Sequence, residues 1–394
     1  MTSQTDPITR AGAVLTIDLD ALAANYTSLA ERSAPSECAA VVKADAYGLG
    51  LAEVAPVLAR AGARTFFVAT LDEGLALRAL LPEARIGVLD GLMPGTEAEF
   101  EAAALTPVLN DLGQIERWRA RAGADGRTRP AFVQIDTGMN RLGLSRADVD
   151  LLEAEPGHLD GLEVAAFMSH LACADTVDHP MTASQIAAFM AALYRLPEAP
   201  ASLANSAGLF RGRQTHFDLV RPGCALYGVN PTPEADNPMR DVVRLEAKVL
   251  QVRDVDSPET VGYGGTHQVV GRSKIATIAA GYADGYFRAL GNRATAFAAG
   301  VALPVVGIVS MDLTTIDITA LPEDALAPGD TIQLIGPDVP VDAVAAAADT
   351  IGYEVLTSLG RRYHRRYVGT GTAGSPTDER PGESPAPRAA GQAG

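Results

Sequence analysis

The stretch Val41-Val42-Lys43-Ala44-Asp45-Ala46-Tyr47-Gly48-Leu49-Gly50 places one lysine at the end of an apolar, strand-like run and directly before a turn that contains glycine. A lysine ammonium has an ordinary pKa of about 10.4 and normally stays in water, so a lysine delivered by an apolar strand needs a partner or a chemical role. Two interpretations are open at this point. Lys43 is either a reactive amine or a buried structural lysine paired with Asp45.

Lys43 ends the first of eight apolar runs, which are separated by amphipathic segments. Two of these segments, Leu51 to Ala61 and Ser184 to Leu196, carry apolar residues at helical spacing. Alternating strand and helix patterns are typical of α/β folds, and eight units predict a closed (β/α)8 TIM-type barrel. The eight runs are Cys38 to Val42, Thr65 to Ala69, Arg85 to Leu89, Thr106 to Leu109, Ala131 to Asp136, Leu162 to Ser169, Ser202 to Asn205 and Phe217 to Arg221.

From Met239 onward the pattern changes to alternating apolar and polar residues with glycine-rich turns, as in Val243 to Val255, which predicts a mainly β second domain. One alanine-rich stretch, Val341 to Thr350, has the pattern of a helix. After Gly369 the sequence has almost no apolar residues, which predicts disorder. We therefore expect an N-terminal arm at 1–11, the barrel at 12–238, a β-rich C-terminal domain at 239–370 and a disordered tail at 371–394.

Composition limits the classes of partner. The 394 residues include 48 Asp and Glu against 32 Lys and Arg, a formal net charge of −16, which disfavours nucleic acid and anionic membranes as partners. Three widely spaced cysteines indicate neither a disulfide framework nor a metal site. The N-terminus lacks the apolar core of a signal peptide, and no apolar run approaches the length of a membrane span. We expect a cytoplasmic protein without a metal.

Candidate reactive residues fall at the carboxyl ends of the predicted strands, where the active sites of such barrels lie. Arg141 follows Asp136 in a glycine turn, and from these residues alone it either binds a carboxylate or phenolic oxygen or pairs with Asp136. The loops after the seventh and eighth strands often bind phosphate, and Ser206 with the backbone N–H groups of Gly223 and Cys224 could do so here. The strand-end candidates are Lys43, Asp136, His170, Asn205 and Arg221.

The Lys43 stretch resembles the pyridoxal-phosphate lysine motif of alanine racemases. Further segments resemble that family in the expected order, and the resemblance extends roughly from Val14 to Val368. These segments are Asp136 to Gly143, Met168 to Leu171, Asn205 to Gly208, Val220 to Tyr227, Ala280 to Tyr286, Ser310 to Asp312 and Tyr353 to Val355.

The resemblance implies a pyridoxal 5'-phosphate enzyme that uses two bases. Lys43 would bind the cofactor covalently and act as one base, and Tyr282 would act as the other. Racemisation removes a proton from one face of Cα and returns it to the other, which one base cannot easily do. The resemblance also implies a head-to-tail homodimer in which Tyr282 and Met311 reach the site from the partner subunit.

The remaining roles are likewise implied by the family. The cofactor phosphate would be bound by Tyr47, Ser206, Gly223, Cys224 and Tyr353, with Asn205 nearby. Arg221 would face the pyridine nitrogen, with His170 hydrogen-bonded behind it, and Arg141 and the Met311 backbone would bind the substrate carboxylate.

One position departs from the family pattern. Gln134 stands where the family usually has a lysine that becomes carbamylated. A carbamate is an anionic acceptor that would orient Arg141, whereas the glutamine amide is neutral. We hypothesise that Gln134 orients Arg141 directly, or that a small anion such as chloride supplies the missing charge.

The resemblance therefore implies an alanine racemase that interconverts L-alanine and D-alanine. We expect it to supply D-alanine for peptidoglycan, and consumption of D-alanine in catabolism is the alternative use. A racemase of broader specificity, favouring serine, is the nearest alternative. A related decarboxylase would lack the Tyr282 segment, and a barrel-only pyridoxal-phosphate carrier would need no second domain.

Overall fold

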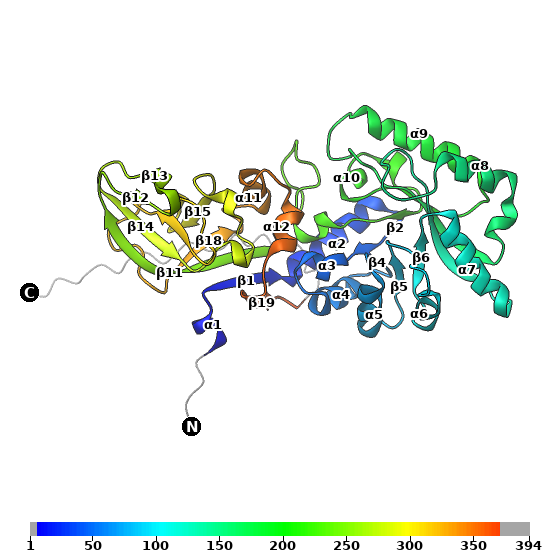
Figure 1. Cartoon of the computed structure of the whole chain (residues 1–394), viewed down its shortest axis with the longest axis horizontal. Coiled ribbons are helices and arrows are strands. Elements are labelled where there is room, and N and C mark those ends of the chain that lie inside the picture. Colours follow the sequence, from blue (N-terminus) through cyan, green and yellow to red (C-terminus); the bar gives the residue numbers. More distant parts are fainter. Residues whose placement is uncertain (1–5, 371–394) are drawn as a thin grey trace, which may run out of the picture.

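The computed structural model describes residues 6–370, without the side chains of residues 123–125. Figure 1 shows two lobes, an α/β lobe on the right and a mainly β lobe on the left. In the described part of the chain, no helix is long and apolar enough to cross a membrane. The tail expected at 371–394 lies outside the described residues.

The α/β lobe is built on parallel strands that correspond to the eight apolar runs. Seven strands pair in the order β3 to β9, and β10 pairs with β2. Their bounds are β2 Glu37–Cys38, β3 Ala40–Val41, β4 Thr65–Val68, β5 Arg85–Val88, β6 Thr106–Leu109, β7 Arg129–Gln134, β8 Leu162–Met168, β9 Ala201–Ser202 and β10 Leu219–Val220.

Backbone hydrogen bonds close these strands into a ring. The N–H of Asp218 donates to the Ala201 carbonyl at 3.0 Å, which joins β10 to β9. The N–H of Ala39, between β2 and β3, donates to the Val220 carbonyl at 2.9 Å. Phe67 and Phe132 pack inside the ring with their ring centroids 5.0 Å apart. The predicted barrel is confirmed, and the carboxyl ends of its strands define the mouth described below.

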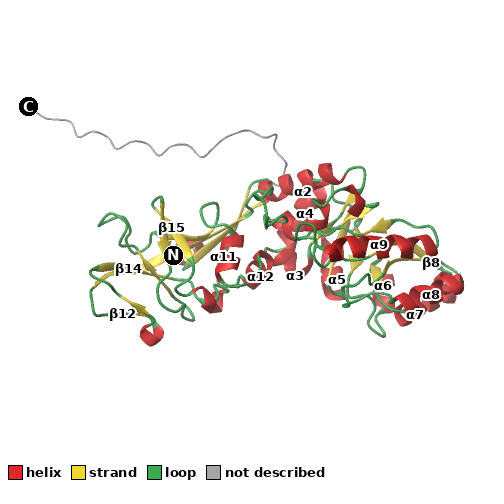
Figure 2. Cartoon of the chain, turned by 90° about the horizontal axis from the view of Figure 1, so that it is seen from above, coloured by secondary structure: helices red, strands yellow, loops and turns green. Residues whose placement is uncertain are grey.

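Helices surround the strands, as the colouring of Figure 2 shows. Several of these helices begin with a residue whose side chain caps the first turn. In α5 the hydroxyl of Thr70 accepts the N–H of Glu73, and the carboxylate of Glu73 accepts the N–H of Thr70. The helices are α2 Leu19–Ser33, α3 Lys43–Tyr47, α4 Leu51–Arg60, α5 Leu71–Leu80, α6 Glu97–Ala102, α7 Leu112–Asp125, α8 Arg146–Ala154, α9 Pro180–Arg195 and α10 Ser206–Leu209.

The second lobe is organised by the long strand β11 (Val243–Val255), which pairs with β1, β14 and β18. A separate hairpin, β12 with β13, lies at its far end. The other elements are β12 Thr260–Val261, β13 His267–Gln268, β14 Ser273–Ile278, β15 Thr295–Ala298, β16 Val301–Pro304, β17 Thr314–Asp317, β18 Thr331–Ile335, α11 Val341–Ala347 and α12 Gly352–Ser358.

The first strand, β1 (Ala13–Asp18), belongs to this second sheet. It pairs antiparallel with β11 and parallel with β19 (His364–Val368). The range 12–238 expected for the barrel therefore included six residues that pair with the other lobe. The short helix α1 (Pro7–Arg10) precedes β1, within the expected arm.

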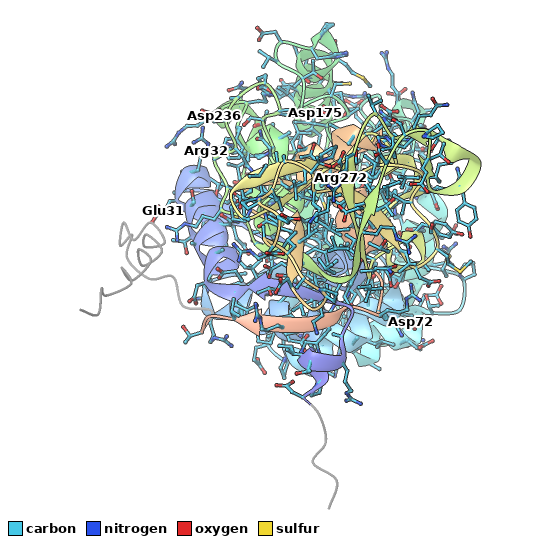
Figure 3. The ribbon with its side chains drawn as sticks, turned by 90° about the vertical axis from the view of Figure 1, so that its left-hand side faces the viewer. Glu31, Arg32, Asp72, Asp175, Asp236 and Arg272 are labelled. Atoms are coloured by element: carbon cyan, nitrogen blue, oxygen red, sulfur yellow. The ribbon has the colours of Figure 1, made fainter. Side chains whose placement is uncertain are left out.

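Charged side chains lie at the periphery, in keeping with the high charge of the chain. Figure 3 views the molecule from the end of the β lobe and labels six residues, all of them exposed. They are Glu31, Arg32, Asp72, Asp175, Asp236 and Arg272.

Candidate active site

Lys43 begins α3, which is a left-handed turn. Ala44, Asp45 and Ala46 have φ of 54–55° and Tyr47 has φ of 57°. Left-handed residues other than glycine cost roughly 1–2 kcal/mol each, so four in succession need strong support from their surroundings. Part of this support is local, because the carboxylate of Asp45 accepts the N–H of Leu51 at 2.7 Å. Asp45 is thus a partner of the backbone, and the alternative of a structural Lys43–Asp45 pair is wrong.

Glu73 supplies further support from the neighbouring helix. One of its carboxylate oxygens accepts the N–H of Ala44 at 2.7 Å, and the other accepts the N–H of Ala69 at 2.8 Å. The same residue that caps α5 therefore fixes the backbone next to Lys43. Sequence reasoning missed this role. The Thr70–Glu73 capping pattern was visible in the sequence, but its contact with a loop 29 residues earlier was not.

The Lys43 amine lies in a partly buried, cationic environment. Burial lowers its pKa most, and the positive charge of Arg141 lowers it further, while Glu73 and Asp90 act in the opposite direction. His170 is also subject to nearby positive charges. Burial, followed by the charges of Arg221, Arg141 and Lys43, lowers the pKa of His170 to about 3, so its imidazole is neutral near neutral pH. The structure thus brings together residues from four strand ends.

Arg141 is exposed in the loop after β7 and makes no ion pair with the residues of 6–370. Asp136 instead accepts the N–H groups of Gly138 and Asn140, so the proposed Arg141–Asp136 pair is wrong. The Nε2 of Gln134 donates to the Leu142 carbonyl at 3.2 Å. Gln134 therefore holds the loop that carries Arg141 and not the guanidinium itself. The chloride hypothesis stays a prediction.

Arg221 is a buried arginine held by neutral oxygens. Its guanidinium donates to the Ser169 carbonyl at 2.6 Å and to the hydroxyl of Ser202. Burial lowers its pKa to about 10, so the side chain remains protonated near neutral pH. The expected hydrogen bond from His170 is not among the contacts of the described residues. Arg221 acts on His170 through its charge, which lowers the pKa of His170.

The loops after β9 and β10 form a cradle of polar groups. The hydroxyl oxygen of Ser206 accepts the N–H of Gly223 at 2.9 Å and that of Ala225 at 3.2 Å, and its own hydrogen remains available to an anion. A Cβ at Gly223 would collide with the hydroxyl of Tyr47. Tyr47 is fixed in turn by stacking on Tyr227, with ring centroids 4.6 Å apart. The Gly223 N–H, expected to bind phosphate, is therefore committed to Ser206, and the hydroxyls of Ser206 and Tyr47 are the donors that the cradle presents.

Three other predicted residues border this cradle. The amide of Asn205 accepts the N–H of Gly208 and donates to the Leu171 carbonyl, so Asn205 caps α10 and positions Ser206. Burial raises the pKa of the Cys224 thiol. Tyr353 is the second residue of α12, and burial followed by the charge of Cys224 raises the pKa of its phenol. A Cβ at Gly48 would approach the Leu356 carbonyl to 2.6 Å, which shows how closely α12 packs on the Lys43 turn.

Tyr282 and Met311 lie together in the β lobe. The N–H of Tyr282 donates to the Ser310 carbonyl at 3.0 Å, and the N–H of Ala283 donates to the Met311 carbonyl at 2.9 Å. Both side chains are exposed, at 42% for Tyr282 and 54% for Met311. These two predicted residues are therefore joined to each other and are presented at the surface of the chain.

Comparisons with known proteins match both lobes. Residues 17–231 match the family model described as alanine racemase, N-terminal domain, and residues 242–367 match alanine racemase, C-terminal domain. An alanine racemase of Rhodospirillum rubrum is 52% identical, over 91% of this chain and 97% of its own. A catabolic alanine racemase of Agrobacterium fabrum is also 52% identical, over 91% of this chain and 92% of its own.

A solved structure matches as well. The alanine racemase of Bartonella henselae, crystallised with covalently bound pyridoxal phosphate, superposes with a TM-score of 0.88 at 43% identity. The match covers 91% of this chain and 100% of that one.

Proposed function

Because the chain belongs to the alanine racemase family, we propose that it interconverts L-alanine and D-alanine with pyridoxal phosphate as its cofactor. The observation that carries the proposal is the position of Lys43. Its amine is partly buried at the barrel mouth, where Arg141 lowers its pKa and where the charge of Lys43 in turn lowers the pKa of His170. A lysine tuned in this way is suited to bind a carbonyl compound covalently.

The residues of the mouth fit the cofactor. Ser206 and the backbone N–H of Cys224, with Tyr47 and Tyr353, would hold the phosphate, while the Gly223 N–H donates to Ser206 and fixes its hydroxyl. Arg221 would hydrogen-bond the ring nitrogen and, as a guanidinium that keeps its proton, would leave that nitrogen unprotonated. When bound, the cofactor would withdraw electrons from the amino acid and so acidify its Cα proton.

The protein groups would then bind and move protons. Arg141, which has no ion pair among the described residues, would bind the substrate carboxylate, together with the backbone N–H of Met311. From L-alanine to D-alanine, Tyr282 would take the Cα proton and Lys43 would return one to the opposite face. From D-alanine to L-alanine the two roles would exchange, and in each direction one proton leaves and one enters Cα.

This assignment requires a homodimer. Tyr282 and Met311 are exposed on the β lobe, which supports their insertion into the site of a second copy. Each dimer would then contain two sites, and each site would use residues from both subunits.

The physiological role is also proposed. The named relatives are alanine racemases, so the serine-preferring alternative has no support among them. One of them is described as catabolic and a matching structure from Pseudomonas aeruginosa as biosynthetic. We propose supply of D-alanine for peptidoglycan, in the cytoplasm, for this chain.

The assignment of Lys43 as the lysine that binds the cofactor can be tested directly, because the chain has few lysines. The sequence contains three lysines, Lys43, Lys248 and Lys274, and the amines of the last two donate to backbone carbonyls. Borohydride reduction of the protein loaded with pyridoxal phosphate, followed by peptide mass spectrometry, should place the added mass on Lys43. Lys274→Ala should leave this label in place, and a label on Lys248 or Lys274 alone would overturn the assignment.

The activity is tested by chiral chromatography. L-alanine incubated with the loaded protein should approach equal amounts of both enantiomers, and L-serine should react far more slowly. Lys43→Ala and Tyr282→Phe should abolish racemisation. Absence of D-alanine from a protein shown to carry the cofactor would refute the proposed function.

A further inference from the structure

We infer that Arg362 is a positioning residue that locks the loops of Tyr282 and Met311 into one unit. Its guanidinium donates from Nε and Nη2 to the two carboxylate oxygens of Asp284, at 2.5 and 2.8 Å. Its third nitrogen, Nη1, donates to Asp312 at 2.7 Å. Asp284 lies two residues after Tyr282, and Asp312 directly follows Met311, so one side chain bonds both loops.

The Asp284 side chain is the anchor of this arrangement, with 7% exposure. Besides binding Arg362, its carboxylate accepts the N–H of Gly281 at 3.1 Å, directly before Tyr282. The backbone carbonyl of Asp284 accepts the N–H of Gly360 at 2.8 Å. The backbone directly before Tyr282 is thus bound to a buried carboxylate, whose charge is balanced by Arg362, and the backbone of Asp284 itself is bound to Gly360.

Direct contact between the two loops makes their positions interdependent. A Cβ at Gly281 would collide with the carbonyls of Ser310 and Met311, so the segments lie at the closest approach that two backbones permit. A shift of either loop would therefore move the other. Loss of Arg362 would remove the one side chain that bonds both loops, through Asp284 two residues after Tyr282 and through Asp312 directly after Met311.

Lysine cannot replace this arginine. The guanidinium offers a planar fork to Asp284 and a third donor to Asp312, whereas an ammonium is a single point charge that cannot reproduce the bidentate geometry. Arg362→Lys preserves the charge and removes only the geometry, so it separates positioning from electrostatics.

The inference rests on the proposed function, and its test uses the difference between the two faces of Cα. In deuterated water, D-alanine should exchange its Cα proton through Lys43 even when Tyr282 is misplaced. For the cofactor-loaded Arg362→Lys enzyme we expect racemisation to fall by at least about tenfold, while Cα exchange in D-alanine stays within about twofold of wild type. Exchange in L-alanine should fall in step with racemisation.

The controls separate this inference from its premise. Arg293→Lys alters an exposed ion pair with Asp349 in the same lobe and should leave both rates unchanged. Tyr282→Phe should show the same difference between enantiomers as Arg362→Lys, in more extreme form. Equal loss of exchange from both enantiomers, or unchanged racemisation in a folded Arg362→Lys dimer, would overturn the positioning role. An inactive wild-type enzyme would instead refute the proposed function.

Discussion

The hydroxyl of Tyr47 lies against the α-carbon of Gly223, where no side chain larger than hydrogen can be accommodated. This contact joins the loop after the first barrel strand to the loop after the eighth. It also brings a phenol next to the N–H that Ser206 accepts.

Gly223→Ala should weaken binding of pyridoxal phosphate. The added methyl group would displace Tyr47 from the phosphate cradle, and the loss of one good hydrogen bond to a charged group corresponds to about tenfold or more in affinity. Titration of the apoenzyme, followed by absorbance, would measure this. Gly157→Ala, where the added Cβ lies no closer than 3.4 Å to another atom, is the matched control. Unchanged affinity in Gly223→Ala would show that the cradle does not bind the phosphate.

Glu73→Gln should destabilise the turn that presents Lys43. The amide can accept one of the two N–H groups of Ala44 and Ala69 but turns its own donor toward the other, at a cost of about 1–3 kcal/mol. Thermal unfolding of the apoenzyme would report this loss. Asp72→Asn, at an exposed neighbouring position in the same helix, should have little effect. Equal melting temperatures for the two variants would contradict the role given to Glu73.

Arg141→Gln should move the pH dependence of Lys43 to higher pH. A nearby positive charge disfavours the ammonium form, so its removal raises the pKa of Lys43 and reduces the neutral amine at any given pH. The rate at which the apoenzyme combines with pyridoxal phosphate, measured from pH 6 to about 10, would give the profile. Arg146→Gln, an exposed position in α8, should leave the profile unchanged. A shift of the profile to lower pH would contradict the proposed effect of Arg141 on the pKa of Lys43.

A halide should bind beside Arg141. The guanidinium has no ion pair among the described residues, and Gln134 is neutral with its Nε2 committed to the Leu142 carbonyl. Crystals grown in bromide should show an anomalous peak at the guanidinium. Gln134→Glu supplies a fixed anion and should remove the peak. If wild-type crystals lack the peak and the kinetics do not depend on chloride, no halide replaces the negative charge that the family's carbamylated lysine supplies and Gln134 lacks.

The sequence predicted the barrel well, because parallel strands that are buried on both faces have short, continuous apolar sequences. It also identified the strand-end residues, since topology alone brings those ends together. The left-handed turn was not predictable in this way. Ala44 and Ala46 have no local preference for positive φ, and contacts of the turn with Glu73 and the α12 backbone hold it in this conformation.

Contacts between distant segments account for the other omissions. β1 has an ordinary strand pattern, and nothing in residues 13–18 reveals that the partner strand is β19. Arg362 stands in a cluster of arginines that a sequence reader assigns to the surface. Its roles depend on Asp284 and Asp312, which lie 78 and 50 residues earlier in the chain.

The position of β1 between β11 and β19 has a consequence for biosynthesis. The barrel that follows β1 can pair its strands locally as they leave the ribosome, whereas β1 must wait for partners made much later. Until β19 is synthesised, one edge of β1 exposes unpaired backbone groups, which are a template for association with other chains. We expect nascent chains truncated before residue 364 to be the species most in need of chaperones.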